Sequence, residues 1–266
     1  MRMTYAILGL GLVLATCGTT HAAISDGLIM YTPMDTVTTD QVGASDDPIM
    51  ANISLTGGKF SGFAYQGAGG LGFPTIKGAA SFGSSFSATA WIRPSLTNTV
   101  VLGNGATNAQ GWTISAANNG NLYVRVSDGV SAQTGNLPFD YTNNPWIFAS
   151  FVYDQGAQTA TFRIQNGYSG ALVTHSFTLD ASASLVSTGG YYWSAGALYH
   201  NSVTNDTRGI DDIAFWGRAL AADEIGQIFN NGDGATIGSL LAVPEPATMS
   251  LLAIGGLAAL IRRKRS

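Results

Sequence analysis

Short alternating runs of apolar residues, divided by Gly, Asn, Asp and Ser, most constrain what this chain can fold into. Such runs are typical of β-strands, and almost no stretch has a helical period. In the segment NLYVRVSDG, Leu122, Val124 and Val126 would face a core. Tyr123 and Arg125 would then face outward, and the Asp-Gly pair would close a tight turn. Because TATFRIQNG repeats the arrangement, we predict two β-hairpins.

Many short strands with one terminal helix predict an all-β fold, an antiparallel two-sheet jelly-roll sandwich. The helix is expected at Ala221–Phe229, where apolar residues form one stripe and Gly232 supplies a stop. Four tryptophans are expected in the core of the sandwich: Trp91, Trp112, Trp146 and Trp216. The predicted strands are Leu28–Met34, Phe86–Arg93, Trp112–Ala116, Asn121–Ser127, Pro145–Tyr153, Thr159–Gln165, Ala171–Leu179, Tyr191–Tyr199 and Ile210–Trp216.

The N-terminus has the layout of a secretory signal peptide over residues 1–23. Arg2 precedes an apolar stretch, and small residues lead to Ala22 and Ala23. The only cysteine, Cys17, lies inside this segment, so cleavage would leave a mature protein without a thiol. A lipoprotein signal ending at Cys17 is the alternative.

The C-terminal segment, residues 243–266, is built unlike any part of a globular core. Pro244, Glu245 and Pro246 hold the chain extended, and an uncharged run of fifteen residues follows at Ala247–Ile261. As a helix that run would span about 22 Å, less than the roughly 30 Å of a bilayer core. A cluster of basic residues follows directly, and we expect it to stay on the cytoplasmic side of the membrane. It consists of Arg262, Arg263, Lys264 and Arg265.

Val243-Pro-Glu-Pro, a short apolar helix and an arginine-rich end together resemble the PEP-CTERM sorting signal of Gram-negative bacteria. The resemblance implies processing by an exosortase and only transient residence in the inner membrane. It also implies delivery to the cell surface or to an extracellular polysaccharide matrix. The alternative is a plain tail anchor behind a Pro-rich linker.

Between the two ends the chain is acidic. Residues 24–243 contain seven Lys or Arg and fifteen Asp or Glu, a net charge of −8. Nucleic acid is therefore not an expected partner. The roughly 220 residues suit one all-β domain, which we place at residues 24–232, with a linker at 233–242.

Several segments in order resemble the LamG-like jelly roll of the concanavalin A-like lectin and glucanase superfamily. The resemblance covers about Gly27–Gly232 and departs from the family pattern between Asp35 and Ala80. It implies a non-catalytic module that binds carbohydrate. The segments are LIMYTPMD, FSATAWIRP, GWTISAANNGNLYVRVSDG, PWIFASFVYDQGAQTATFRIQNG and GIDDIAFWGRALAADEIGQIFNNG.

Asp211 and Asp212 lie side by side in a strand that should be buried, so alternation would send one carboxylate to each face. A buried charge needs a partner, which could be Arg218, backbone amides or a hard cation such as Ca²⁺. Family members often carry a structural calcium, which makes Asp35 a companion metal ligand in that case.

Catalytic groups are scarce. A glycosidase of this superfamily needs paired carboxylates, yet the chain has only two glutamates, Glu224 and Glu245. His175 is expected at an outward strand position, and neither it nor His200 lies in a nucleophile motif. We therefore expect no enzyme, and a carbohydrate-active enzyme ranks last among the alternatives.

Binding residues are expected in the densest aromatic cluster, Tyr191, Tyr192 and Trp193, because aromatic faces stack on sugar rings. Strand alternation would place at least one of the three in the core. The sequence thus favours an exported carbohydrate-binding module. The alternative is a structural or adhesive surface protein that binds other proteins.

Overall fold

The computed structural model describes residues 23–33, 53–56, 58–60, 64–67, 75–76, 85–93, 99–103, 111–116, 120–128, 130–139, 146–167, 170–180, 185, 193–195 and 209–241. The chain divides into a compact unit, Gly27–Leu240, and a second unit that combines Met1–Asp26 with Leu241–Ser266. In the second unit, the backbone N–H of Ala23 donates to Asp26 Oδ2 at 3.1 Å.

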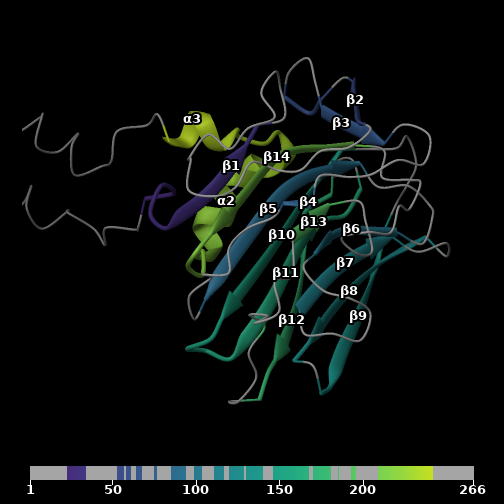
Figure 1. Cartoon of the computed structure of the whole chain (residues 1–266), viewed down its shortest axis with the longest axis vertical. Coiled ribbons are helices and arrows are strands. Elements are labelled where there is room, and N and C mark those ends of the chain that lie inside the picture. The colour runs from purple at the N-terminus through teal and green to yellow at the C-terminus, as the bar shows by residue number, and fades with distance from the viewer. Residues whose placement is uncertain are drawn as a thin grey trace, which may run out of the picture. The chain divides into compact units, whose positions relative to one another are not determined.

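The compact unit contains two antiparallel sheets (Figure 1). The large sheet consists of β1 (Leu28–Thr32), β2 (Ile53–Thr56), β3 (Ala64–Gly67), β5 (Phe86–Arg93), β10 (Ile147–Asp154), β11 (Thr159–Gln165), β12 (Leu172–Thr178) and β14 (Gly209–Trp216). Its order is β12-β11-β10-β5-β14-β3-β2, and β1 also pairs with β14.

The small sheet consists of β4 (Thr75–Ile76), β6 (Thr99–Gly103), β7 (Gly111–Ala116), β8 (Asn121–Ser127), β9 (Ala132–Pro138) and β13 (Trp193–Ala195). Its order is β4-β13-β6-β7-β8-β9. The helices among the described residues are α2 (Ala222–Phe229), η1 (Asn230–Gly232) and α3 (Ile237–Leu241). The predicted all-β architecture with two antiparallel sheets and a short helix is confirmed at this level.

The main core lies between the two sheets. Alternate residues of the strands whose side chains are described enter it, as Leu122, Val124 and Val126 of β8 do. Across the interface, the Trp112 ring of β7 stacks on the Phe151 ring of β10, with centroids 4.2 Å apart and planes 10° apart. This stacked pair joins the small sheet to the large one at the centre of the core.

A second apolar layer covers the outer face of the large sheet, the face turned away from the small sheet. Trp91 and Phe148 of this face lie 5.5 Å apart between ring centroids. Phe229 of α2 packs on Phe148 at 5.8 Å. The tryptophans predicted in the core are therefore divided: Trp112 belongs to the main core, whereas Trp91 and Trp216 are buried outside it.

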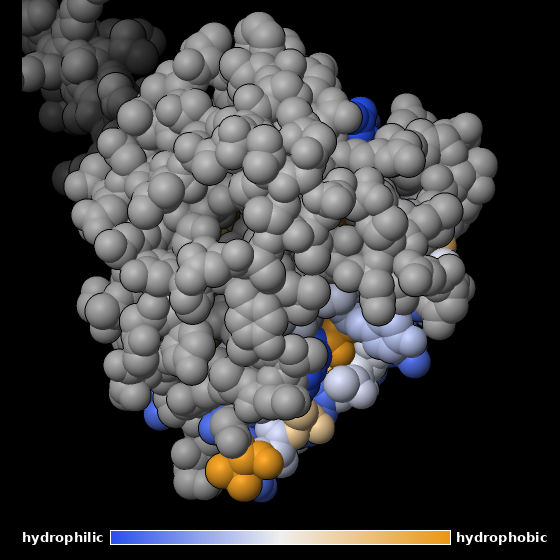
Figure 2. Space-filling view, turned by 45° about the vertical axis from the view of Figure 1, so that its right-hand side comes forward, coloured by the Kyte–Doolittle hydropathy of each residue, from blue (hydrophilic) through white to orange (hydrophobic). Residues whose placement is uncertain are grey.

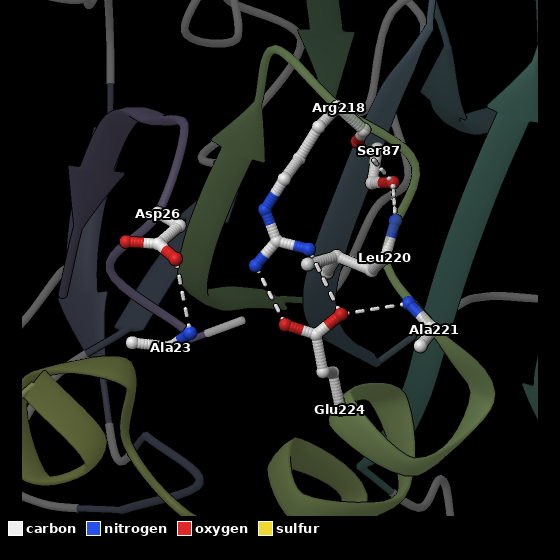
Figure 3. A network of polar contacts seen from close by, with 7 residues as sticks. All are labelled: Ala23, Asp26, Ser87, Arg218, Leu220, Ala221 and Glu224. Carbon is white, nitrogen blue, oxygen red and sulfur yellow. Dashed lines mark hydrogen bonds and ion pairs between the residues drawn. The ribbon is translucent and has the colours of Figure 1, made fainter. Parts of the chain in front are cut away.

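The corner between β14 and α2 is fixed by a buried carboxylate (Figure 3). The two terminal nitrogens of Arg218 donate to the two Glu224 oxygens at 2.8 and 2.6 Å. The N–H of Ala221 donates to Glu224 Oε2 at 2.8 Å, which satisfies one free donor at the helix start. Ser87 of β5 accepts from the Leu220 N–H at 2.9 Å and donates to the Arg218 carbonyl at 2.8 Å.

Both predicted hairpins are present, because β8 pairs with β9 and β11 pairs with β12 in antiparallel register. At the first turn, Asp128 Oδ1 accepts from the N–H groups of Val130 and Ser131 at 2.8 and 2.7 Å. These backbone donors, Ser131 above all, hold the pKa of Asp128 below its ordinary value.

Several elements differ from the sequence expectation, and β2, β3, β4 and β6 are strands that were not predicted. β9 follows the first hairpin turn at a segment, AQTGNLP, that was not among the predicted strands. The strand expected at Tyr191–Tyr199 is described only at β13. The predicted linker at 233–242 contains α3, whose Ile237 is fully buried.

The signal peptide and the apolar run with its basic end lie outside the described residues. Within the described part of the chain, no helix has both the length and the hydropathy needed to cross a bilayer.

Trp112→Ala should lower the free energy of unfolding by about 3–5 kcal/mol, since it removes a large buried ring from the interface between sheets. Urea denaturation of the purified chain measures this. Val130→Ala serves as the control, because Val130 is 96% exposed. A Trp112→Ala loss no larger than that of the control would contradict the packing of the two sheets.

Candidate functional site

A β-bulge interrupts β14 at the two aspartates identified from the sequence. The register of β14 against β5 shifts between Asp211 and Ala214, and Asp212 has a left-handed backbone with φ of 50°. Ile210 and Ile213 on either side both enter the main core. Asp211 lies opposite Trp91, and Asp212 accepts a hydrogen bond from Tyr31; both partners lie outside the main core. Because the bulge inserts an extra residue, both carboxylates lie on the outer side of the sheet, which differs from the expected placement on opposite faces.

Both carboxylates are buried and accept hydrogen bonds from segments far away in sequence. Tyr31 Oη donates to Asp212 Oδ1 at 2.8 Å, and the Ile237 N–H donates to Asp212 Oδ2 at 3.2 Å. The Lys59 N–H donates to Asp211 Oδ2 at 2.7 Å. The bulge therefore ties β1, α3 and the segment at 58–60 to β14.

Lys59 completes this arrangement with its side chain. Its ammonium lies 4.2 Å from the centroid of the Trp91 ring and donates to the Gly232 carbonyl at 2.9 Å. Burial lowers the pKa of Lys59, and the charge of Asp233 opposes that shift. The contacts of Lys59 hold the turn after α2 against β5.

These contacts bear on the calcium expected at Asp35, Asp211 and Asp212. Three of the four carboxylate oxygens of the bulge already accept hydrogen bonds from protein donors. Arg218, another expected partner, forms its ion pair with Glu224. The described residues contain no group of three or more His, Cys, Asp or Glu that could hold a metal ion. Asp35 lies outside them, so the calcium site stays a prediction.

The predicted aromatic cluster falls mostly outside the described residues. Tyr191 and Tyr192 are not described, and Trp193 begins β13 of the small sheet, where it pairs with Ile76. Its neighbour Ser194 pairs with Gly103 of β6, which in turn pairs with Thr113 of β7. The sheet that contains β13 therefore also contains the face described next.

The outer face of β7, β8 and β9 gathers polar side chains around one aromatic ring. Tyr123 and Arg125 are half-buried on this face, as their alternation with core residues predicted. Four further residues belong to it: Thr113 and Ser115 are half-buried, and Thr134 and Asn136 are exposed. We call these six residues the β7–β9 face.

Strand register places the six residues in two rows across the sheet. Ser115, Tyr123 and Asn136 lie opposite one another in one row, and Thr113, Arg125 and Thr134 in the next. Side chains that are directly opposite have Cβ atoms about 4.5–5.5 Å apart. Hydroxyl, amide and guanidinium groups thus flank the Tyr123 ring on neighbouring strands. Figure 2 brings the β7–β9 side forward, and its described residues are mostly blue or pale.

Arg125 supplies the only charge among these six side chains. Its Nε is buried and has no hydrogen-bond partner within the described part of the chain. Sequence reasoning placed Arg125 outward but did not single it out, because β9, which completes its row, was not predicted as a strand.

His175 lies where the free edges of the two sheets meet. Its ring is 4.6 Å from that of Phe177, and Val173 on the same face packs against the main core. A side chain on Gly135 of β9 would meet the His175 ring, with Cβ 2.4 Å from Nε2. The expected outward position of His175 is therefore wrong, because it shares the period of two with Val173 and Phe177.

Gln133 of β9 also bridges this edge, donating to the Thr178 carbonyl at 2.9 Å. A small polar depression lies beside it, between the β8–β9 turn and the end of β12. It is lined by Val126, Asp128, Ser131, Gln133, Leu179 and Asp180.

Comparison with solved structures shows the fold. The chain matches the binding domain of botulinum neurotoxin serotype D/C VPI 5993 with a TM-score of 0.56 and 18% identity, over 78% of this chain and 53% of that one. It therefore spans about half the length of that domain. Trypanosoma rangeli sialidase matches with a TM-score of 0.55 and 13% identity, over 78% of this chain and 33% of that one.

Domain 4 of AbnA, an extracellular arabinanase of Geobacillus stearothermophilus in complex with arabinotriose, matches over most of its length. The TM-score is 0.53 at 17% identity, and the match covers 74% of this chain and 96% of that one. No curated protein matches the sequence.

The end of the chain matches a family model. Residues 242–265 match the PEP-CTERM protein-sorting motif, which confirms that resemblance. The motif implies processing by an exosortase. It indicates that this chain is an exported protein that passes through a membrane-anchored sorting step, with a β-sandwich domain as the exported part.

Proposed function

We propose that this protein is a non-catalytic, LamG-like jelly-roll module that binds carbohydrate and is delivered to the cell surface or an extracellular polysaccharide matrix. The β7–β9 face carries the proposal. There, the Tyr123 ring is flanked in register by the Ser115 hydroxyl and the Asn136 amide. An aromatic ring between polar groups suits a sugar, whose C–H bonds pack on the ring while its hydroxyls form hydrogen bonds.

The predicted cluster of Tyr191, Tyr192 and Trp193 is kept as a further part of the proposed binding site, since its last residue, Trp193, begins β13 of the same sheet. The two glutamates of the chain support the non-catalytic role. Glu224 is committed to the corner through Arg218 and Ala221, and Glu245 lies in the matched sorting motif. A glycosidase would need a pair of carboxylates across a cleft, and the ion pair of Glu224 with Arg218 does not suit that role.

Tyr123→Ala should weaken glycan binding on the order of tenfold, because the stacking surface is lost. A glycan array with the purified full chain identifies the sugar, and titration of the variant measures the loss. Val130→Ala, at the exposed hairpin tip, is the matched control and should bind as the unmodified chain does. If no sugar binds with or without calcium, the structural or adhesive role is left.

For the tail, we propose that the exosortase cleaves near Val243, Pro244, Glu245 and Pro246, so that the membrane segment is only temporary. Mass spectrometry of the mature protein should then find a C-terminus upstream of the basic residues. Replacing Pro244, Glu245 and Pro246 by alanine should retain the uncleaved form. A wild-type protein that still ends at Ser266 would indicate a permanent anchor instead.

We also propose the structural calcium at Asp35, Asp211 and Asp212. A cation bound only by the folded state stabilises it, so EDTA should lower the melting temperature and added calcium should restore it. Magnesium, which prefers fewer protein ligands, is the control. An unchanged melting temperature would contradict the calcium proposal. The hydrogen bonds from Tyr31, Lys59 and Ile237 would then be what compensates the two carboxylates.

A further inference from the structure

The β7–β9 face contains a cation, Arg125, one of whose donors is buried without an acceptor among the described residues. No described residue accepts a hydrogen bond from the buried Nε of Arg125. The groups opposite it are the hydroxyls of Thr113 and Thr134, which carry no charge. A buried N–H donor without an acceptor is costly, and the half-buried guanidinium that contains it carries a positive charge, so its placement favours an anionic ligand.

The chemistry of that ligand follows from the shape of the guanidinium. Its planar, forked donors match a carboxylate, which accepts two parallel hydrogen bonds. Tyr123 lies two residues along the same strand on the same face, about 6.6 Å away at 3.3 Å per residue. A sugar ring packed on Tyr123 would therefore bring a carboxylate of its own or of the next sugar to Arg125.

We propose that the ligand of the β7–β9 face is an acidic polysaccharide containing uronic acid, held by Arg125 through the sugar carboxylate and by Tyr123 through the ring. This rests on the carbohydrate-binding function proposed above. The domain as a whole is acidic, so the recognition is local and depends on one side chain. Salt screening limits long-range repulsion to about 8–10 Å.

Arg163 of β11 offers a matched comparison. It too is half-buried on an outer face, that of the large sheet, and its Nη1 has no hydrogen-bond partner among the described residues. Burial lowers the pKa of Arg163. Its in-register neighbours are Ser150 and Thr174, and the residues two positions away are Thr161 and Gln165, none of them aromatic. The ring of its diagonal neighbour Phe148 is fully buried, so it offers no surface for stacking. Arg163 has the charge of Arg125 without the stacking surface.

The experiment measures binding of the purified full chain to immobilised polygalacturonate, alginate and hyaluronan, and to the methyl ester of each. Esterification removes the charge but keeps the backbone. We expect at least one acidic form to bind on the order of tenfold tighter than its ester. Arg125→Gln should abolish that difference, and Arg125→Lys should restore part of it, because lysine keeps the charge without the fork. Arg163→Gln should bind as the unmodified chain does.

Neutral dextran and linear arabinan complete the panel, and circular dichroism verifies that each variant is folded. Equal binding of ester and acid, or binding of neutral polymers alone, would overturn the uronate inference and leave the carbohydrate-binding function in place. An equal loss from Arg163→Gln would also overturn it, since general charge attraction would then explain the binding. Binding to none of the polysaccharides would overturn both proposals.

Discussion

Two buried carboxylates in β14 determine how the outer side of the large sheet is built. Every residue of β14 is buried, and the bulge places Asp211 and Asp212 in that buried strand. A charge in such a place is costly unless hydrogen bonds compensate it. Tyr31, Lys59 and Ile237 supply those bonds from three separate segments. The partners of two adjacent side chains thus fix the positions of β1, α3 and the segment at 58–60.

This requirement gives the two sheets different roles. The centre of the large sheet's outer face is taken up by the bulge, by Trp91 with Lys59, and by Phe148 under α2. The corner beside it uses Glu224 and Arg218. On the β7–β9 face, by contrast, the Nε of the one charged group, Arg125, has no acceptor among the described residues. Structural and recognition roles are therefore proposed for opposite sides of the sandwich.

The sequence predicted the strands whose apolar residues alternate and missed those without alternation. Asn121–Ser127 and Thr159–Gln165 were predicted at their observed bounds, and the hairpins that they begin were confirmed. β9 has no apolar alternation, because it is an edge strand with five exposed residues. Its strand state comes from pairing with β8, which a local pattern does not encode.

Sequence alone determined the periodicity of the main strands, the outward direction of Tyr123 and Arg125, and the sorting motif, because each depends on neighbours within a few positions along the chain. The tertiary structure decided the bulge, the inward direction of His175, and the gathering of six side chains on the β7–β9 face. Each of these depends on hydrogen bonds or packing between strands, and the register of those contacts is fixed only when the sheets assemble.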